Sequence, residues 1–334
     1  MFFVQQTDDY HYGLFRIESG NDAVPVLLAS VETPTQLGQH DGYIPVKNVI
    51  ATPDKVYYYA LASVTDDGAY RRASYEMIQI NKDGTGACPV DLGATEFQFI
   101  GIDGFNLYYE SYSDNEIYCL DLISTQVTKI SGFKEEVEKE FFGNKFGVYN
   151  GAFYYQDSES QGERYNTHYY SVDISSRERK HICSIEGRYP TEPLRFAEGY
   201  LFVYGLKDFG SPFFTMSVDL SSGETHLIAE TEDYLAACDI SVSRGSVYYI
   251  ADDNTVYAAD ITGKNNRRLF GDEIFTGHEI GFSGIWAAGD WLYYKRLLED
   301  YDAYSQLWFG KIGDVNICRI RLDGSFGPVS PIIR

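Results

Sequence analysis

Histidine is the residue type in this chain that is best suited to metal or proton chemistry. Four of the six histidines fall in long connecting segments, and these are His11, His40, His168 and His278. Imidazole nitrogens are good ligands for transition metals, but the four come from different segments and show none of the short spacings that define a metal motif. The sequence therefore favours exposed histidines and no metal site, with a site built from these four as the alternative.

Arginines form a second group of candidate site residues, because a guanidinium can bind a carboxylate through two parallel hydrogen bonds. Arg71 and Arg72 are adjacent, and Arg164 precedes Tyr165. The chain has 49 acidic and 27 basic residues. These arginines therefore either bind a carboxylate ligand or neutralise acidic neighbours, and we favour neutralisation. We keep Arg71, Arg72, Arg164 and Tyr165 as candidate ligand-binding residues.

The segment 295–315 carries more aromatic residues than a strand needs. The candidate ligand-binding residues in it are Arg296, Tyr301, Tyr304, Trp308 and Phe309. Trp and Tyr supply large, rigid contact area. The alternative, which we rank slightly ahead, is that these side chains pack the segment against its neighbouring strands.

No motif in the sequence specifies a reaction. There is no Gly-x-Ser-x-Gly elbow, phosphate-binding loop or dinucleotide fingerprint, and the Asp-rich turns at 66–68 and 252–254 lack the ligand spacing of a calcium loop. We therefore predict no cofactor, and we expect a protein that is not an enzyme. With 49 acidic residues in the chain, a pair of facing catalytic carboxylates stays open as an alternative.

The elements that would position these residues follow a repeated pattern, in which a turn is followed by two aromatic residues. Copies lie at 54–58, 104–109, 150–155, 199–203, 245–249 and 289–294, and a seventh begins at Phe2-Phe3. A second strand, a tight turn rich in Gly, Ser, Asn and Asp, and a third short strand follow each copy, while a short apolar run precedes it. Each unit therefore predicts four antiparallel strands, with the aromatic strand second.

Tandem units of about 45 to 50 residues are typical of β-propeller blades. We predict one all-β domain over residues 1–334, a β-propeller of four-stranded antiparallel blades with seven units, and six is the alternative count. The first unit has no room for its first strand, and residues 328–333 are already needed as the last strand of the final unit. One blade is therefore three-stranded, or the chain has lost residues at its start.

The repeat resembles a known family. The aromatic-Tyr-Tyr strands and the turns at 81–86 (Asn-Lys-Asp-Gly-Thr-Gly) and 319–324 (Arg-Ile-Arg-Leu-Asp-Gly) look like those of bacterial uncharacterised propeller domains related to the YWTD propellers of low-density-lipoprotein receptors. The resemblance covers most of the chain, although a literal Tyr-Trp-Thr-Asp tetrapeptide is missing. Because these motifs build blades, the resemblance implies a fold and no particular function.

Charge and hydropathy limit the partners that the chain can have. Its 49 acidic and 27 basic residues give a formal net charge of -22, which repels nucleic acid and anionic lipid. The amino terminus has no basic region before an apolar stretch, and no apolar run reaches membrane-spanning length. We expect no nucleic-acid partner and no membrane insertion, and a cytoplasmic protein, or an extracellular one if the chain is a fragment of an exported protein.

The pattern of cysteines favours reduced thiols. The chain has five cysteines, Cys88, Cys119, Cys183, Cys238 and Cys318, spread through different repeats without a C-x-x-C pair. Each falls in an expected strand, which predicts reduced, buried thiols in place of disulfides or zinc ligands.

Loop length predicts which face of the propeller is functional. Long insertions are expected at 31–43, 65–74, 133–145, 156–167, 271–282 and 295–315, all of them between second and third strands or between units, and these connections emerge on one face. Long loops on a rigid scaffold concentrate binding residues. We therefore expect a binding or interaction module that holds a protein, peptide or glycan on this face; the alternative is a carbohydrate-active enzyme, a glycosidase with paired carboxylates or a metal-assisted lyase.

Overall fold

Every regular element that the structure describes is a β-strand. The structure, a computed structural model, describes residues 2–6, 11–16, 26–32, 46–66, 71–94, 97–130, 146–161, 164–186, 195–206, 212–232, 240–251, 255–271, 279–288, 290–298 and 315–322. The strands form seven antiparallel sheets, of which five have four strands and two have three.

We number the five four-stranded sheets as blades 1 to 5. Blade 1 contains β4 (Val46–Ala51), β5 (Lys55–Asp66), β6 (Arg71–Asn81) and β7 (Cys88–Pro89). Blade 2 contains β8 (Phe97–Asp103), β9 (Asn106–Ser111), β10 (Glu116–Asp121) and β11 (Val127–Ile130). Blade 3 contains β12 (Phe146–Tyr149), β13 (Ala152–Gln161), β14 (Arg164–Asp173) and β15 (Arg179–Glu186).

Two further blades and two three-stranded sheets complete the described architecture. Blade 4 contains β16 (Arg195–Ala197), β17 (Tyr200–Leu206), β18 (Phe213–Asp219) and β19 (Thr225–Thr231). Blade 5 contains β20 (Ile240–Ser243), β21 (Ser246–Ile250), β22 (Val256–Asp260) and β23 (Arg267–Phe270). The N-terminal sheet is β1 (Phe2–Gln6), β2 (His11–Arg16) and β3 (Val26–Glu32), and the C-terminal sheet is β24 (Glu279–Ala288), β25 (Trp291–Leu298) and β26 (Val315–Arg321).

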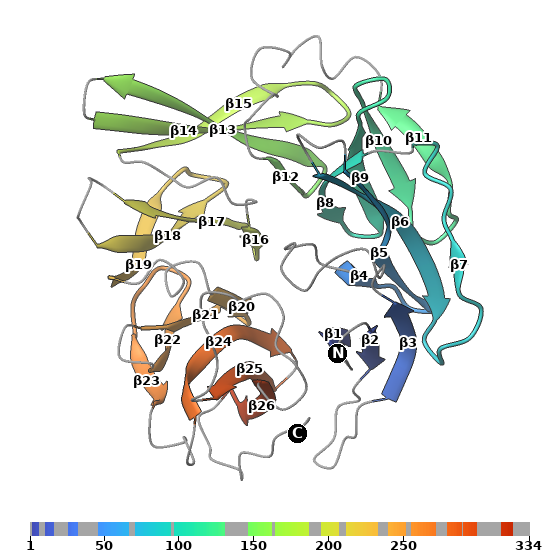
Figure 1. Cartoon of the computed structure of the whole chain (residues 1–334). Helices are drawn as coiled ribbons and strands as arrows, with labels where there is room; N and C mark the ends of the chain where they lie inside the picture. The colour runs from blue at the N-terminus through green and yellow to red at the C-terminus, as the bar shows by residue number, and fades with distance from the viewer. Residues whose placement is uncertain are drawn as a thin grey trace.

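The sheets are arranged around a common centre, as in a propeller (Figure 1). First strands of neighbouring sheets contact one another, as β12 does with β8 and β16, which places these strands at the inner edge. The predicted all-β propeller of four-stranded antiparallel blades is confirmed. The predicted count of seven four-stranded blades is wrong, as is the count of six, because five sheets have four strands. The N-terminal sheet starts directly with its aromatic strand, and the strand expected at 328–333 lies outside the described residues.

The paired aromatics explain how successive blades adhere. In β9, Tyr109 is buried between blades 1 and 2, whereas Tyr108 is buried between blades 2 and 3. Successive residues of a strand point to opposite faces of its sheet, so two adjacent aromatics fill two different inter-blade cores. The aromatic strands β5, β9, β13, β17 and β21 are second in their four-stranded blades, as predicted.

The first hairpin of each blade closes with a tight turn. In blades 3, 4 and 5 the two central residues of this turn, Asn150-Gly151, Glu198-Gly199 and Arg244-Gly245, all have positive φ. Positive φ at both positions is the requirement of a type I′ hairpin turn, and its twist matches that of the flanking strands.

These first turns also hold neighbouring sheets together through contacts that we call turn clasps. Gly151 N donates to Asp103 Oδ2 at 2.6 Å, from blade 3 to blade 2. Gly199 N donates to the Tyr149 hydroxyl at 2.8 Å. Gly245 N donates to Glu198 Oε2 at 2.7 Å. The series ends with an ion pair of 2.6 Å between Arg244 and Asp290, which joins blade 5 to the C-terminal sheet.

Within a blade, the turn between the third and fourth strands lies beside the first turn. Ile174 N donates to Gly151 O at 2.9 Å, Leu220 N to Gly199 O at 3.1 Å, and Ile261 N to Gly245 O at 3.1 Å. The first and third turns therefore share one face of the propeller, which we call the turn face. The second hairpins, such as that between β13 and β14, open on the other side, which we call the loop face.

The described cysteines agree only in part with the prediction of buried thiols. Cys183 is buried and Cys119 half-buried, and both lie in strands, whereas Cys88 is exposed on β7. These three thiols are free. Cys88 differs because β7 is a two-residue strand at the end of its sheet. The side chains of Cys238 and Cys318 lie outside the described residues.

Candidate functional site

For most of the candidate ligand-binding and metal-binding residues, the side chain lies outside the described structure. Tyr301, Tyr304, Trp308, Phe309, His40 and His278 lie outside the described residues. Arg296 lies in β25, Arg71 and Arg72 in β6, Arg164 and Tyr165 in β14, and His11 in β2, where their backbone alone is described. These residues therefore belong to four different sheets.

Two of the expected insertions are hairpin extensions rather than loops. The segment 156–167 forms the ends of β13 and β14, which pair up to Gln161 and Arg164. The segment 65–74 likewise continues β5 and β6, which pair up to Asp66 and Arg71. Both segments are rich in polar residues. Figure 1 shows the β13–β14 hairpin reaching away from the ring.

His168, considered at first as a metal ligand, belongs to a compact polar cluster on blade 3. Its Nδ1 atom lies 2.7 Å from Ser184 Oγ, on the neighbouring strand β15. Its Nε2 atom lies 4.0 Å from Glu159 Oε2 of β13, on the other side. His181 Nε2 also approaches Ser184 Oγ, at 2.9 Å. We call Glu159, His168, His181 and Ser184 the blade 3 cluster.

The sheet register explains how residues so far apart meet. His168 pairs with Ser184 across β14 and β15, and with Asp157 across β13 and β14. Glu159 is two residues from Asp157 on the same face, which makes it a diagonal neighbour of His168. A bulge between Tyr169 and Tyr170 shifts the register so that Tyr170 faces His181. The Tyr170 ring meets the His181 ring edge-on at 5.2 Å and fixes its plane.

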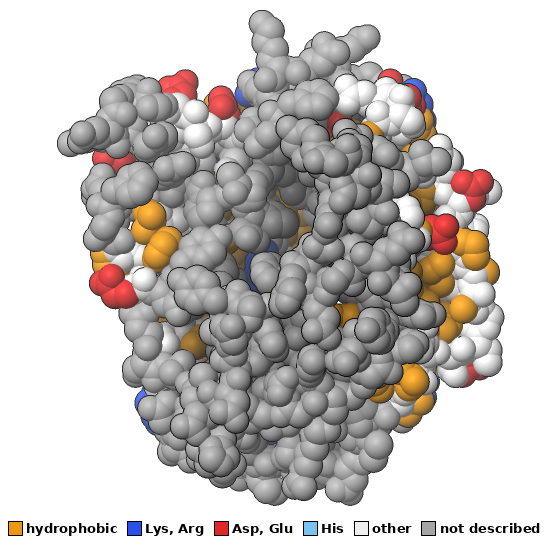
Figure 2. All heavy atoms as spheres, in the orientation of Figure 1, with side chains coloured by type: hydrophobic (Ala, Val, Ile, Leu, Met, Phe, Trp, Pro, Cys, Tyr) orange, Lys and Arg blue, Asp and Glu red, His pale blue; other side chains and the backbone are white. Residues whose placement is uncertain are grey.

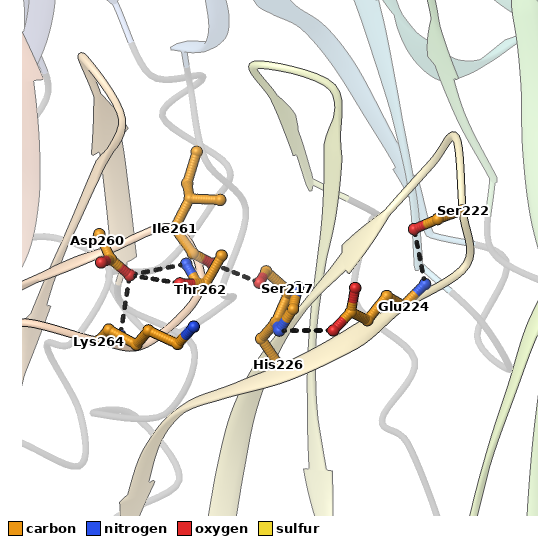
Figure 3. Close-up of polar contacts among 8 residues, drawn as sticks. All are labelled: Ser217, Ser222, Glu224, His226, Asp260, Ile261, Thr262 and Lys264. Atoms are coloured by element: carbon orange, nitrogen blue, oxygen red, sulfur yellow. Dashed lines mark hydrogen bonds and ion pairs between the residues drawn. The ribbon is translucent and has the colours of Figure 1, made fainter.

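A similar set of residue types occurs in blade 4 with a different environment. Figure 3 shows Ser217 pointing towards the carbonyl of Ile261 in blade 5, and the Ser217 hydroxyl donates to that oxygen at 2.6 Å. His226 pairs with Ser217 in the sheet register and lies 3.9 Å from Glu224 through its Nδ1 atom. Ser217 is fully buried. Ser217 therefore fastens blade 4 to blade 5, and its buried hydroxyl is out of reach of a substrate.

Carboxylates on the turn face are occupied by their own turns. Asp173 Oδ1 accepts hydrogen bonds from the backbone N–H groups of Ser175 and Ser176, at 2.9 and 2.7 Å, and from both hydroxyls. These bonds, that from the Ser176 N–H first, lower the pKa of Asp173 to about 2. Asp121 and Asp219 repeat the arrangement, and their pKa values are lowered by hydrogen bonds from Ile123 N and Ser221 Oγ respectively. We assign these acids to turn formation.

Exposed apolar side chains gather on the outer part of blades 1 and 2 in the view of Figure 2. In blade 2, Phe105 and Ile123 are 46% and 56% exposed, at the tips of the first and third turns. Leu122 N donates to Phe105 O at 2.8 Å, which holds the two tips together.

The described residues were predicted to form neither a metal site nor a membrane-spanning segment. Within the described ranges, no three His, Cys, Asp or Glu side chains gather closely enough to hold a metal ion. The same residues contain no helix with the length and apolar character needed to cross a bilayer.

Sequence reasoning did not identify Ser184, His181 or Glu159. Their contact depends on the pairing of three strands and on a bulge, and neither can be read from the spacing of residues along the chain. His181 and Ser184 lie in an outer strand with polar side chains at 179, 180, 181 and 184. This pattern could have marked them as candidate site residues.

Comparison with known proteins identifies the fold. No protein-family model and no curated protein matches the sequence. Among solved structures, Pyrococcus horikoshii acylaminoacyl peptidase aligns with a TM-score of 0.54 at 10% identity, over 87% of this chain and 46% of that one. The β-propeller domain of the Trilobed protease from Pyrococcus furiosus aligns with a TM-score of 0.51 at 9% identity, over 100% of this chain and 98% of that one. This chain thus spans less than half of the length of the acylaminoacyl peptidase.

These likenesses correct two expectations. They show the propeller fold, but no relation to the YWTD propellers of low-density-lipoprotein receptors. They also overturn the predicted function, a general binding module with a carbohydrate-active enzyme as the alternative, because these neighbours are a peptidase and the propeller domain of a protease and not glycan-binding modules. The expected protein partner on the loop face stays a prediction. Loop length and surplus aromatics misled the prediction, since a rigid scaffold with long loops can serve many functions.

Proposed function

We propose that this chain is a peptidase-associated propeller, a ring that accompanies a peptidase while the partner carries out peptide-bond hydrolysis. The observation that carries the proposal is the alignment with a protease propeller domain over the whole of this chain and 98% of that domain. The acylaminoacyl peptidase supports it, because this chain matches only part of that enzyme.

The contacts of the two faces suggest which one meets the peptidase. On the turn face, the turn clasps and the Asp173-type turns already use the polar groups of the short loops. The loop face instead presents the long β13–β14 hairpin, which extends beyond its own blade's first strand. We propose that the peptidase is held on the loop face, with this hairpin in the contact.

The experiment is to express the tagged chain in the organism that encodes it and to assay captured material for hydrolysis of N-acetylated and free fluorogenic peptides. We expect the chain purified alone to release no fluorophore and the captured complex to release it. A second form of the chain replaces residues 160–165 by an Asn-Gly turn, which keeps the Glu159–Asn166 pair as the end of the hairpin.

The matched control is Glu224→Gln on the turn face, where the Glu224 side chain is 71% exposed. Shortening the hairpin should reduce the captured peptidase activity, and Glu224→Gln should leave it unchanged. Capture of no more peptidase activity than with the tag alone would overturn the proposed function. Equal capture by the shortened form would overturn the assignment of the loop face.

A further inference from the structure

The blade 3 cluster brings two imidazole rings to one serine hydroxyl. Both contacts are within hydrogen-bonding distance, 2.7 Å from Ser184 Oγ to His168 Nδ1 and 2.9 Å to His181 Nε2. A serine hydroxyl donates one hydrogen bond and accepts up to two, so Ser184 Oγ can donate to one imidazole while it accepts from the other. The tautomers of the two histidines decide which of them is the acceptor.

Glu159 decides which histidine accepts. Its carboxylate faces Nε2 of His168 at 4.0 Å, which favours the tautomer with the proton on Nε2, because a carboxylate attracts an N–H group and repels a lone pair. The Nδ1 lone pair of His168 is then directed at Ser184 and accepts its hydroxyl proton. His181, in turn, donates its Nε2–H to Ser184 Oγ and supports negative charge on that oxygen.

We propose that Ser184 is a reactive nucleophile that accepts an acyl group from small activated esters, with His168 as its general base. A serine hydroxyl within hydrogen-bonding distance of a histidine, with an acid on the far side of the ring, is the arrangement that activates a hydroxyl for acyl transfer; here the acid lies 4.0 Å from His168 Nε2. The inference is independent of the peptidase association, which concerns hydrolysis by a partner. Tyr170 is a positioning residue, because it touches the His181 ring and not the serine.

Solvent exposure distinguishes the blade 3 cluster from the Ser217, Glu224 and His226 set of blade 4. Ser184 is exposed, and the His168 side chain is 21% exposed. Ser217 is 0% exposed, and its proton is used by the Ile261 carbonyl (Figure 3). The same chain thus contains an accessible and an inaccessible serine with histidine as the cross-strand partner, which provides an internal control.

The transfer balances in atoms and charge. Ser184 Oγ forms a bond to the ester carbonyl carbon as its proton passes to His168 Nδ1, and the resulting imidazolium is stabilised by Glu159. The tetrahedral intermediate then expels the alcohol, which takes the proton from His168, and a water molecule later releases the acid by the same route.

The test uses an alkyl fluorophosphonate probe, which forms a stable adduct with nucleophilic serines, with intact mass measurement and peptide mapping. We expect one adduct, on Ser184, and none on Ser217. His168→Gln should reduce the labelling rate by about 100-fold, as expected for loss of a general base.

Two further variants make the result specific. Ser184→Ala should abolish the adduct, while Ser158→Ala, which removes an exposed hydroxyl on the same hairpin, should leave the labelling rate unchanged. Glu159→Gln should slow labelling without changing the melting temperature. An absence of label, a label spread over several serines, or a His168→Gln rate equal to that of the parent chain would overturn the proposal.

Discussion

Glu198 of blade 4 accepts a hydrogen bond of 2.7 Å from the backbone N–H of Gly245 in blade 5. Glu198 is itself a central residue of a tight turn, with a φ of 52°, so one residue both shapes its own hairpin and holds the next blade. A corresponding contact is made by Asp103 two joints earlier in the ring, by Tyr149 one joint earlier, and by the Arg244–Asp290 ion pair at the next joint. Four different side chains therefore perform the same mechanical role.

The first prediction concerns this contact. Glu198→Ala removes the acceptor and leaves Gly245 N without it, whereas Glu198→Gln keeps an oxygen at a similar position. We expect Glu198→Ala to lower the free energy of unfolding by about 1 kcal/mol relative to Glu198→Gln. Both variants keep a side chain at the same positive φ, so their difference reports the loss of the hydrogen-bond acceptor. Denaturant unfolding measures this difference in stability, and equal midpoints would show that the clasp adds none.

The clasp also shows what sequence can and cannot predict. The recurrence of Tyr-Tyr strands predicted the strand order within each blade, because burial on both faces of a strand demands aromatic residues at consecutive positions. The Glu198–Gly245 contact joins residues 47 positions apart, and its members differ in type from joint to joint, so no motif marks it. The His168–Ser184 contact was missed for the same reason, since it depends on register.

The expected insertion at 156–167 is largely part of two paired strands. The second half of β13 has the sequence Gln156-Asp157-Ser158-Glu159-Ser160-Gln161, which lacks the apolar alternation of a half-buried strand. These residues still belong to a strand because β14 supplies backbone hydrogen bonds, which do not depend on side-chain polarity.

Three buried tyrosines of one inter-blade core give a second prediction. The Tyr57 hydroxyl donates to Leu122 O, and the Tyr109 hydroxyl donates to Leu92 O, each at 2.5 Å. The Tyr59 hydroxyl, in contrast, is buried with no hydrogen-bond partner among the described residues, and burial raises its pKa well above the ordinary value. Because an unsatisfied buried hydroxyl costs free energy, Tyr59→Phe should leave stability unchanged or increase it.

Tyr57→Phe and Tyr109→Phe are the matched comparisons. Each removes a satisfied donor from a buried site and should destabilise the chain by about 1 kcal/mol. The measurement is the unfolding midpoint of the three variants in urea at one pH. A Tyr59→Phe loss as large as that of Tyr57→Phe would mean that the Tyr59 hydroxyl is satisfied in solution.

Acid should destabilise the turn face through Asp173. Its pKa is about 2 in the folded chain, below the ordinary aspartate value of 3.8, so the folded state binds this proton less readily than the unfolded state does. The corresponding stability is fully present above about pH 4 and is lost as the pH falls towards 2. Asp173→Asn should therefore reduce the slope of unfolding free energy against pH between these values. Titration curves of unfolding that are parallel for the two proteins would contradict this assignment.

The last prediction concerns the close approach of blade 5 to blade 4 at Gly263. A Cβ atom added there would lie 2.0 Å from the carbonyl oxygen of Leu227, and the φ of 75° already disfavours any side chain. Gly93, at a φ of 66°, has no atom within 4 Å of the same added Cβ. Gly93→Ala should therefore cost only the conformational term, about 1 to 2 kcal/mol, while Gly263→Ala should cost clearly more because a backbone carbonyl must move. Thermal and denaturant unfolding of the two variants would measure the difference, and equal losses would show that blades 4 and 5 can separate at this point without cost.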